Sequence, residues 1–139
     1  MSDAPRVSPE EARDLLASGY TYIDVRTEAE FEAGHVPGAL NVPYQTKGVA
    51  NADFVPVITA AFTKEAPLLI GCQTGSRSLK AARDLAQAGF TNLRELRTGF
   101  GGSRDAFGRP EPGWSKAGLP VEAGTPEGQR YADVKRRGG

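Results

Sequence analysis

The fold of this chain is decided by the stretch LLIGCQTGSRS at residues 68–78. Its first four residues, from Leu68 to Gly71, are apolar or small and are typical of the end of a buried strand. The only cysteine, Cys72, follows, and apolar residues recur at helical spacing after Arg77. We therefore expect Cys72 where a strand turns into a helix, and open α/β sheets bind ligands at that edge.

Three features of this turn favour the thiolate form of Cys72. The start of a helix offers unpaired N–H groups and a partial positive charge. Gly75 lets the backbone amides curl around the sulfur, and Arg77 adds a positive charge. We expect the pKa of Cys72 to lie below its free value, which makes the sulfur a nucleophile. A lone cysteine is otherwise usually a small buried hydrophobe, so the surrounding pattern decides between the two interpretations.

The rest of the chain predicts alternating strands and helices. Strands are expected at residues 20–25, 39–42, 66–71 and 91–96, with helices beginning near Ser8, Thr27, Asp53 and Arg77. A short edge strand is expected at Val7, and loops at 47–53 and 98–113. This alternation predicts an α/β fold in which helices cover both faces of a parallel sheet.

The ordered motifs resemble those of the rhodanese (sulfurtransferase) family. CQTGSRS at 72–78 resembles its active-site loop, and IDVR at 23–26 and GHVPGA at 34–39 resemble its upstream motif. The resemblance covers residues 7–121 and is closest to small single-domain members. It implies a rhodanese-like three-layer α/β/α domain with a central parallel sheet. Residues 122–139 are then expected to form a solvated, flexible C-terminal tail.

The resemblance implies persulfide transfer as the reaction. Cys72 takes a sulfane sulfur from thiosulfate or a similar small donor and passes it to cyanide, a thiol or a sulfur-relay protein. Residues 73–77 supply amides around the terminal sulfur, and no metal or organic cofactor is needed. The family usually places a tryptophan four residues after its Gly-Gly pair. Here that position is Ala106, and Trp114 comes eight residues after Ala106. The insertion, Gly102–Gly113, is interpreted either as a flap beside the site or as a passive surface feature.

The loop residues have individual expected roles, each with an alternative. Arg77 either binds an anionic donor or holds the loop closed through carbonyl groups. Ser76 and Ser78 either donate hydrogen bonds to the sulfur or cap the helix. Gln73 and Thr74 are expected to face the mouth of the site, with the small Thr74 leaving the entrance open.

Two residues of the upstream motif are expected to support the loop. The resemblance implies that Asp24 supports it directly and that Arg26 pairs with an acidic residue, here Glu30. Both are interpreted as structural support for the loop and not as directly catalytic residues. The only histidine, His35, is expected to pack a structural turn, although a Cys–His pair would also suit a general-base mechanism.

Two other kinds of function stay open. Cysteine phosphatases and related arsenate reductases typically have one more residue in the loop than the four that separate Cys72 from Arg77 here. The shorter loop fits a single sulfur and favours sulfur transfer. A non-catalytic or partner-dependent rhodanese-like module is the other alternative, although such modules commonly lack the cysteine.

Composition limits the classes of partner. The chain has 139 residues, with 17 basic and 17 acidic side chains, so no net charge attracts nucleic acid or a membrane surface. A single cysteine excludes an internal disulfide and a cysteine-rich metal site. The N-terminal residues show no signal-peptide pattern, so the expected location is cytoplasmic.

Overall fold

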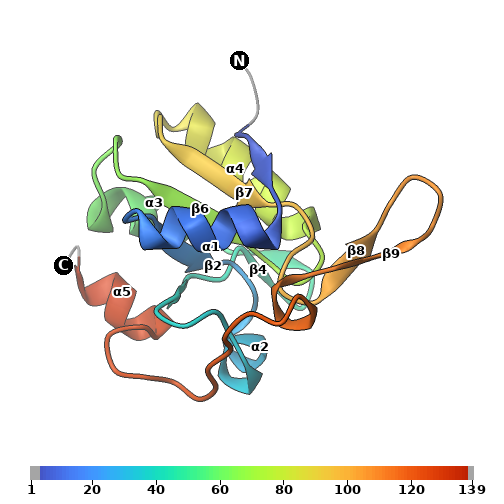
Figure 1. Cartoon of the computed structure of the whole chain (residues 1–139). Helices are drawn as coiled ribbons and strands as arrows, with labels where there is room; N and C mark the ends of the chain where they lie inside the picture. Colours follow the sequence, from blue (N-terminus) through green and yellow to red (C-terminus); the bar gives the residue numbers. More distant parts are fainter. Residues whose placement is uncertain (1–3, 138–139) are drawn as a thin grey trace.

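The computed structural model describes residues 4–137 and is built on one parallel sheet (Figure 1). The five strands lie in the order β1-β7-β6-β2-β3, and every neighbouring pair is parallel. The strands are β1 (Arg6–Val7), β2 (Thr21–Asp24), β3 (Leu40–Asn41), β6 (Leu68–Gly71) and β7 (Leu93–Leu96). Because β6 is central, all four of its residues are buried, as its apolar run indicates.

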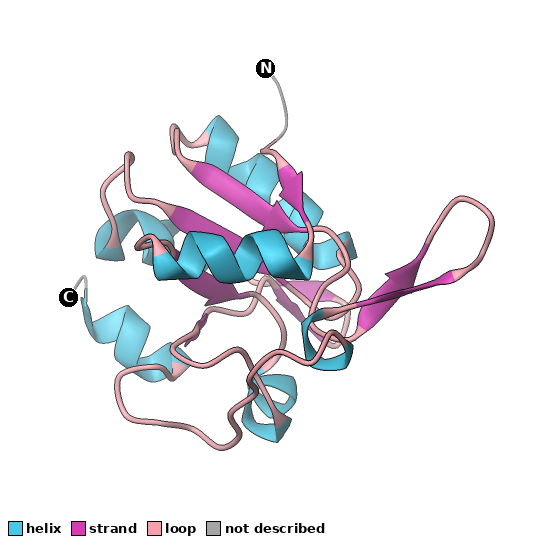
Figure 2. Ribbon diagram, viewed as in Figure 1, coloured by secondary structure: helices cyan, strands magenta, loops and turns pink. Residues whose placement is uncertain are grey.

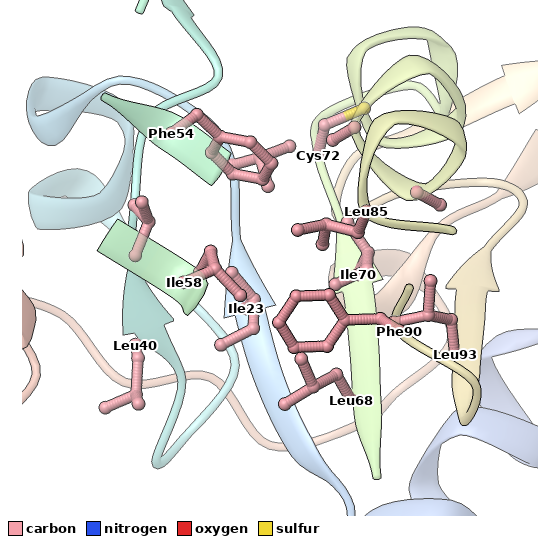
Figure 3. Close-up of a cluster of buried hydrophobic side chains, with 14 of the residues drawn as sticks. Ile23, Leu40, Phe54, Ile58, Leu68, Ile70, Cys72, Leu85, Phe90 and Leu93 are labelled. Carbon is pink, nitrogen blue, oxygen red and sulfur yellow. The ribbon is translucent and has the colours of Figure 1, made fainter. Parts of the chain in front are cut away.

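Helices cover both faces of the sheet, which confirms the predicted three-layer α/β/α fold (Figure 2). Side chains from α3, α4 and α5 pack on one face, and Figure 3 shows part of this core. Side chains from α1, α2 and a short 3-10 helix at Trp114–Lys116 pack on the other. The helices are α1 (Pro9–Ala17), α2 (Glu28–Ala33), α3 (Phe54–Ala61), α4 (Ser76–Gln87) and α5 (Tyr131–Arg137).

Capping residues fix where the helices begin. Ser8 and Glu11 form a capping box at α1, and Thr27 and Glu30 form one at α2. Both helix starts agree with the sequence prediction. Asp53 was expected to cap α3, but its side chain makes no capping bond; instead its backbone N–H donates to Asn51 Oδ1 at 3.0 Å.

Two expected loops contain strands. The expected loop at 47–53 contains the turn and the second strand of a small hairpin, in which β4 (Gln45–Thr46) pairs with β5 (Val49–Ala50). Lys47 and Gly48 both have positive φ, at 52° and 77°, as a tight two-residue hairpin turn requires. Residues 98–113 hold a second hairpin, β8 (Gly102–Arg104) with β9 (Pro110–Pro112), which projects from the domain in Figure 1.

Residues 122–137 pack on the domain and so differ from the solvated tail that the polar composition predicted for residues 122–139; Gly138 and Gly139 lie outside the described residues. Glu122 and His35 exchange backbone hydrogen bonds of 2.8 and 2.9 Å. Val134 of α5 is fully buried in the core that α3 also covers. Tyr131 packs partly buried against the same core, and two apolar side chains in a polar helix are a signal too weak to stand out in the sequence. Within residues 4–137 there is no helix of the length and apolar character needed to cross a membrane.

Candidate active site

Cys72 lies directly after β6, at the carboxyl edge of the central strand. Figure 3 shows its sulfur beside α4. The residue is buried, and Sγ accepts a hydrogen bond from the backbone N–H of Gly75 at 3.1 Å. Sγ also lies 3.3 Å from the hydroxyl oxygen of Ser78, in the first turn of α4. The sequence prediction of a cysteine between strand and helix is confirmed.

Gly75 makes the turn possible. Its φ of +98° lies in the left-handed region, and it forms the N-cap of α4 without a side-chain capping bond. A Cβ at this position would stand 2.2 Å from the carbonyl oxygen of Arg97. A residue with a side chain would therefore push the loop away from the end of β7 and move the Gly75 amide off the sulfur.

The segment after β7 holds the loop from the other side. Phe100 N–H donates to the carbonyl of Cys72 at 2.7 Å, and Gly101 N–H donates to that of Gln73 at 2.9 Å. Gly99 has a φ of +69°, and a Cβ there would stand 2.4 Å from the Gln73 carbonyl oxygen. The close approach of the two backbones fixes the carbonyls of Cys72 and Gln73 against the segment after β7.

Arg26 pairs with Asp24, not with Glu30 as the resemblance implied. Its guanidinium donates to both carboxylate oxygens of Asp24, with Nη2 to Oδ2 at 2.8 Å, and both residues are buried. Two residues along an extended chain are close enough for this contact, so no partner from α2 is needed. Arg26 Nη1 also donates to the side-chain oxygen of Gln73 at 3.0 Å, which connects this pair to the residue after the cysteine.

Glu30 instead binds Arg77. Two guanidinium nitrogens of Arg77 donate to the two carboxylate oxygens of Glu30, at 2.7 and 3.0 Å. This hydrogen-bonded pair lowers the pKa of Glu30 to about 2, because Arg77 stabilises the ionised carboxylate. The pair fixes the start of α4 to α2, while donor binding by Arg77 stays a prediction.

The remaining loop residues line the surface around the buried sulfur. Thr74 and Ser76 are exposed, and Gln73 is half-buried. Thr74 lines a cavity of about 620 Å³ whose far wall is the β8–β9 hairpin. Gln73, Phe100 and Lys116 line another of about 510 Å³ on the Arg26 side. Cys72 lines neither cavity, so the mouth position expected for Gln73 and Thr74 stays a prediction.

One buried carboxyl at the site was missed in the sequence. Glu95 of β7 has a fully buried side chain, and Ser78 Oγ donates to its Oε2. Arg6 Nε donates to Oε1 of the same carboxyl at 2.5 Å. A charged residue between Arg94 and Leu96 looks like the exposed position of a strand, and only the sheet order, with β7 between β1 and β6, shows that it faces the cysteine loop.

His35 packs away from this chemistry. Its ring stacks on Phe31, with centroids 3.8 Å apart, and its ring nitrogens contact the Phe31 carbonyl at 2.7 Å and Glu122 at 2.9 Å. These contacts agree with the structural turn that was predicted for it. Among residues 4–137, no three His, Cys, Asp or Glu side chains come together in a group that could hold a metal ion.

Comparison with known proteins identifies the family. A family model described as a rhodanese-like domain matches residues 8–105, and the chain therefore belongs to the rhodanese family. The chain is 40% identical over 121 residues to thiosulfate sulfurtransferase 16, chloroplastic, of Arabidopsis thaliana, an alignment covering 84% of this chain and 92% of that protein.

A bacterial relative and a solved structure agree with this assignment. Thiosulfate sulfurtransferase GlpE of Pseudomonas fluorescens is 34% identical over 100 residues, which cover 72% of this chain and 84% of that one. The crystal structure of Rv0390 from M. tuberculosis superposes with a TM-score of 0.75 at 29% identity, over 88% of this chain and all of that one. The resemblance seen in the sequence is confirmed.

Proposed function

We propose that this protein is a sulfurtransferase that carries a sulfane sulfur as a persulfide on Cys72, taking it from thiosulfate or a similar donor. The observation that carries the proposal is the Gly75 amide aimed at Sγ from 3.1 Å, at the start of a twelve-residue helix. Both features stabilise negative charge on sulfur. The names of the Arabidopsis and Pseudomonas relatives support thiosulfate as the donor.

In the loading step, the Cys72 thiolate attacks the outer sulfur of thiosulfate. A sulfur–sulfur bond forms to Cys72, the bond between the two donor sulfurs breaks, and sulfite leaves with that electron pair. The negative charge moves to the terminal persulfide sulfur. An aligned amide donor at such a position contributes about 3–4 kcal/mol when the charge is excluded from water.

In the discharge step, cyanide or a thiolate attacks the terminal sulfur. The persulfide bond breaks, and its electron pair returns to Cys72 as thiolate, so the protein is ready for another donor. The thiolate acceptor can belong to a small molecule or to a sulfur-relay protein. We place this cycle in the cytoplasm, where a reducing environment keeps the free thiol available.

The donor is proposed to enter through the cavity lined by Gln73 and Lys116. Arg77 is occupied by Glu30, so the exposed ammonium of Lys116 is better placed to attract a dianion to the mouth. Gln73, the residue after Cys72, lines that cavity, and its side chain is held by Arg26. We propose that the donor displaces the Gln73 side chain and reaches Cys72 from the Arg26 side.

The test is the kinetic pattern of thiocyanate formation from thiosulfate and cyanide. Transfer through a persulfide predicts parallel double-reciprocal lines, because sulfite leaves before cyanide binds. Cys72→Ser should lose activity, and Lys116→Ala should raise the thiosulfate concentration needed for half-maximal rate. Intersecting lines, or normal activity of Cys72→Ser, would rule out a Cys72 persulfide.

A further inference from the structure

A continuous line of hydrogen bonds runs from the cysteine to the edge of the sheet. Cys72 Sγ lies 3.3 Å from Ser78 Oγ, which donates to Glu95 Oε2. On its other oxygen, Glu95 accepts from Arg6 Nε at 2.5 Å. The four residues come from separate elements, since Cys72 follows β6, and Ser78, Glu95 and Arg6 lie in α4, β7 and β1.

Burial of the ionised Glu95 carboxyl group is energetically unfavourable. Its side chain is fully buried, and burial raises the pKa of Glu95, while hydrogen bonds from Arg6 and Ser78 oppose that rise. The other charged or titratable groups facing it are Arg97 at the end of β7 and the buried Tyr22 of β2. Among the hydrogen bonds of residues 4–137, the hydroxyl of Ser78 is the one group that contacts both this carboxyl and the sulfur.

We infer that Cys72 and Glu95 share one proton through the hydroxyl group of Ser78. When the proton is on sulfur, the thiol donates to Ser78 Oγ and the Ser78 hydroxyl donates to the ionised carboxyl of Glu95. When the thiol ionises, its proton passes to Ser78 Oγ as the hydroxyl proton of Ser78 passes to Glu95. Each hydrogen bond reverses, Ser78 then donates to the thiolate, and the net charge of the group does not change.

The inference deepens the proposed function, on which it rests, by giving the proton of the nucleophile a destination. Cys72 is buried, so direct loss of its proton to water is obstructed. An ionised Glu95 would also repel the thiolate across Ser78, whereas a protonated one does not. Glu95 is thus a positioning residue that acts through Ser78, and it does not itself contact the sulfur.

The pH dependence of Cys72 alkylation by iodoacetamide tests the shared proton. Two coupled groups ionise in two macroscopic steps, so the wild-type rate should rise, level off and rise again with pH. Glu95→Gln should give a single rise, at least about one pH unit below the second wild-type rise. Ser78→Ala removes the hydrogen bond to the thiolate and should slow alkylation at neutral pH about tenfold or more.

Asp133→Asn is the matched control. Asp133 is also a buried carboxyl that accepts a hydrogen bond from an arginine, Arg130 Nε at 2.8 Å, but it lies in α5 and has no contact with Ser78 or Cys72 in the described chain. Its alkylation profile should coincide with that of wild type. A Glu95→Gln profile that coincides with wild type as well would overturn the inference.

A second measurement leaves Glu95 unchanged and so does not depend on that variant folding. The side-chain carboxyl carbon of Glu95 can be followed by NMR in wild type and in Cys72→Ala. We expect its resonance to titrate a second time over the pH range in which alkylation accelerates, and that step to be missing in Cys72→Ala. Identical carboxyl titrations in the two proteins would refute a shared proton.

Neither measurement uses a sulfur donor, which separates the inference from the proposed function. If thiosulfate fails to load the protein while the two-step profile is present, the donor assignment fails and the shared proton stands. If loading proceeds while the profiles of wild type and Glu95→Gln agree, the function stands and the shared proton fails.

Discussion

Replacing Gly75 with alanine should release the sulfur from its amide donor and destabilise the fold. Gly75 has a φ of +98°, and an added Cβ would stand 2.2 Å from the carbonyl oxygen of Arg97. That oxygen belongs to the backbone at the end of β7, so it has little freedom to move. The loop must therefore shift, and the Gly75 N–H now 3.1 Å from Sγ shifts with it.

The size of both effects follows from these contacts. A left-handed conformation costs a residue with a Cβ about 1–2 kcal/mol. Forcing an extra carbon into a packed contact adds about 1–3 kcal/mol. Gly75→Ala should therefore lower the free energy of unfolding by about 2–5 kcal/mol. Loss of one aligned amide donor should slow sulfur loading about 100- to 1000-fold.

Gly19→Ala provides the matched control. Gly19 has a similar φ of +109°, but a Cβ there would meet no atom within 4 Å. It lies beyond the end of α1, away from the loop, so it carries the conformational cost of about 1–2 kcal/mol without the clash. Sulfur loading by this variant should match wild type.

The two variants are compared by urea unfolding and by the single-turnover release of sulfite from thiosulfate. The unfolding free energies should differ by the cost of the clash, and only Gly75→Ala should release sulfite slowly. The reasoning is refuted if Gly75→Ala is no less stable than Gly19→Ala and releases sulfite at the wild-type rate.

Three further changes test the ion pair, the C-terminal helix and the hairpin. Arg77 lowers the pKa of Glu30 to about 2 from 4.5, so the ion pair stabilises the fold above pH 4.5 and this stabilisation is lost as the pH falls from 4.5 to about 2. In acid unfolding, Glu30→Gln should therefore lose less stability over that pH range than wild type does. Equal losses would contradict the pairing. Val134→Ala should lower the free energy of unfolding by about 2 kcal/mol, whereas Val49→Ala, at a 70% exposed position, should change it by less than about 0.5 kcal/mol; equal effects would mean that α5 does not anchor on the core. Deleting residues 103–111 removes the hairpin from the Thr74 cavity but keeps Gln73 and Lys116, which line the proposed entry, so the thiosulfate loading curve should not change; a higher thiosulfate concentration for half-maximal loading would instead make the hairpin a flap over the site.

The sheet and most helices were predictable because their signals are local. The apolar run at 68–71 and the capping boxes at Ser8 and Thr27 each act within a few residues, and the structure follows them. The turn at Gly75 was predictable for the same reason, since a glycine between a strand and a helix is typical of a left-handed cap.

The pairings at the site were not predictable, because they depend on which strands become neighbours. Glu30 and Arg77 are 47 residues apart in sequence, and Arg6 and Glu95 are 89 apart. The family resemblance predicted an ion pair between Arg26 and Glu30, whereas Arg26 pairs with Asp24, two residues earlier in the chain. The helix at 131–137 was missed because it contributes only the buried Val134 and the partly buried Tyr131 to the apolar core.

The most direct test of the account is the intact mass of the protein after incubation with thiosulfate and then with cyanide. We expect thiosulfate to add the mass of one sulfur atom, cyanide to remove it, and Cys72→Ser to show no gain. A wild-type protein with a reduced thiol and no added mass would contradict loading of Cys72 by thiosulfate. An equal gain in Cys72→Ser would contradict the assignment of the persulfide to this residue.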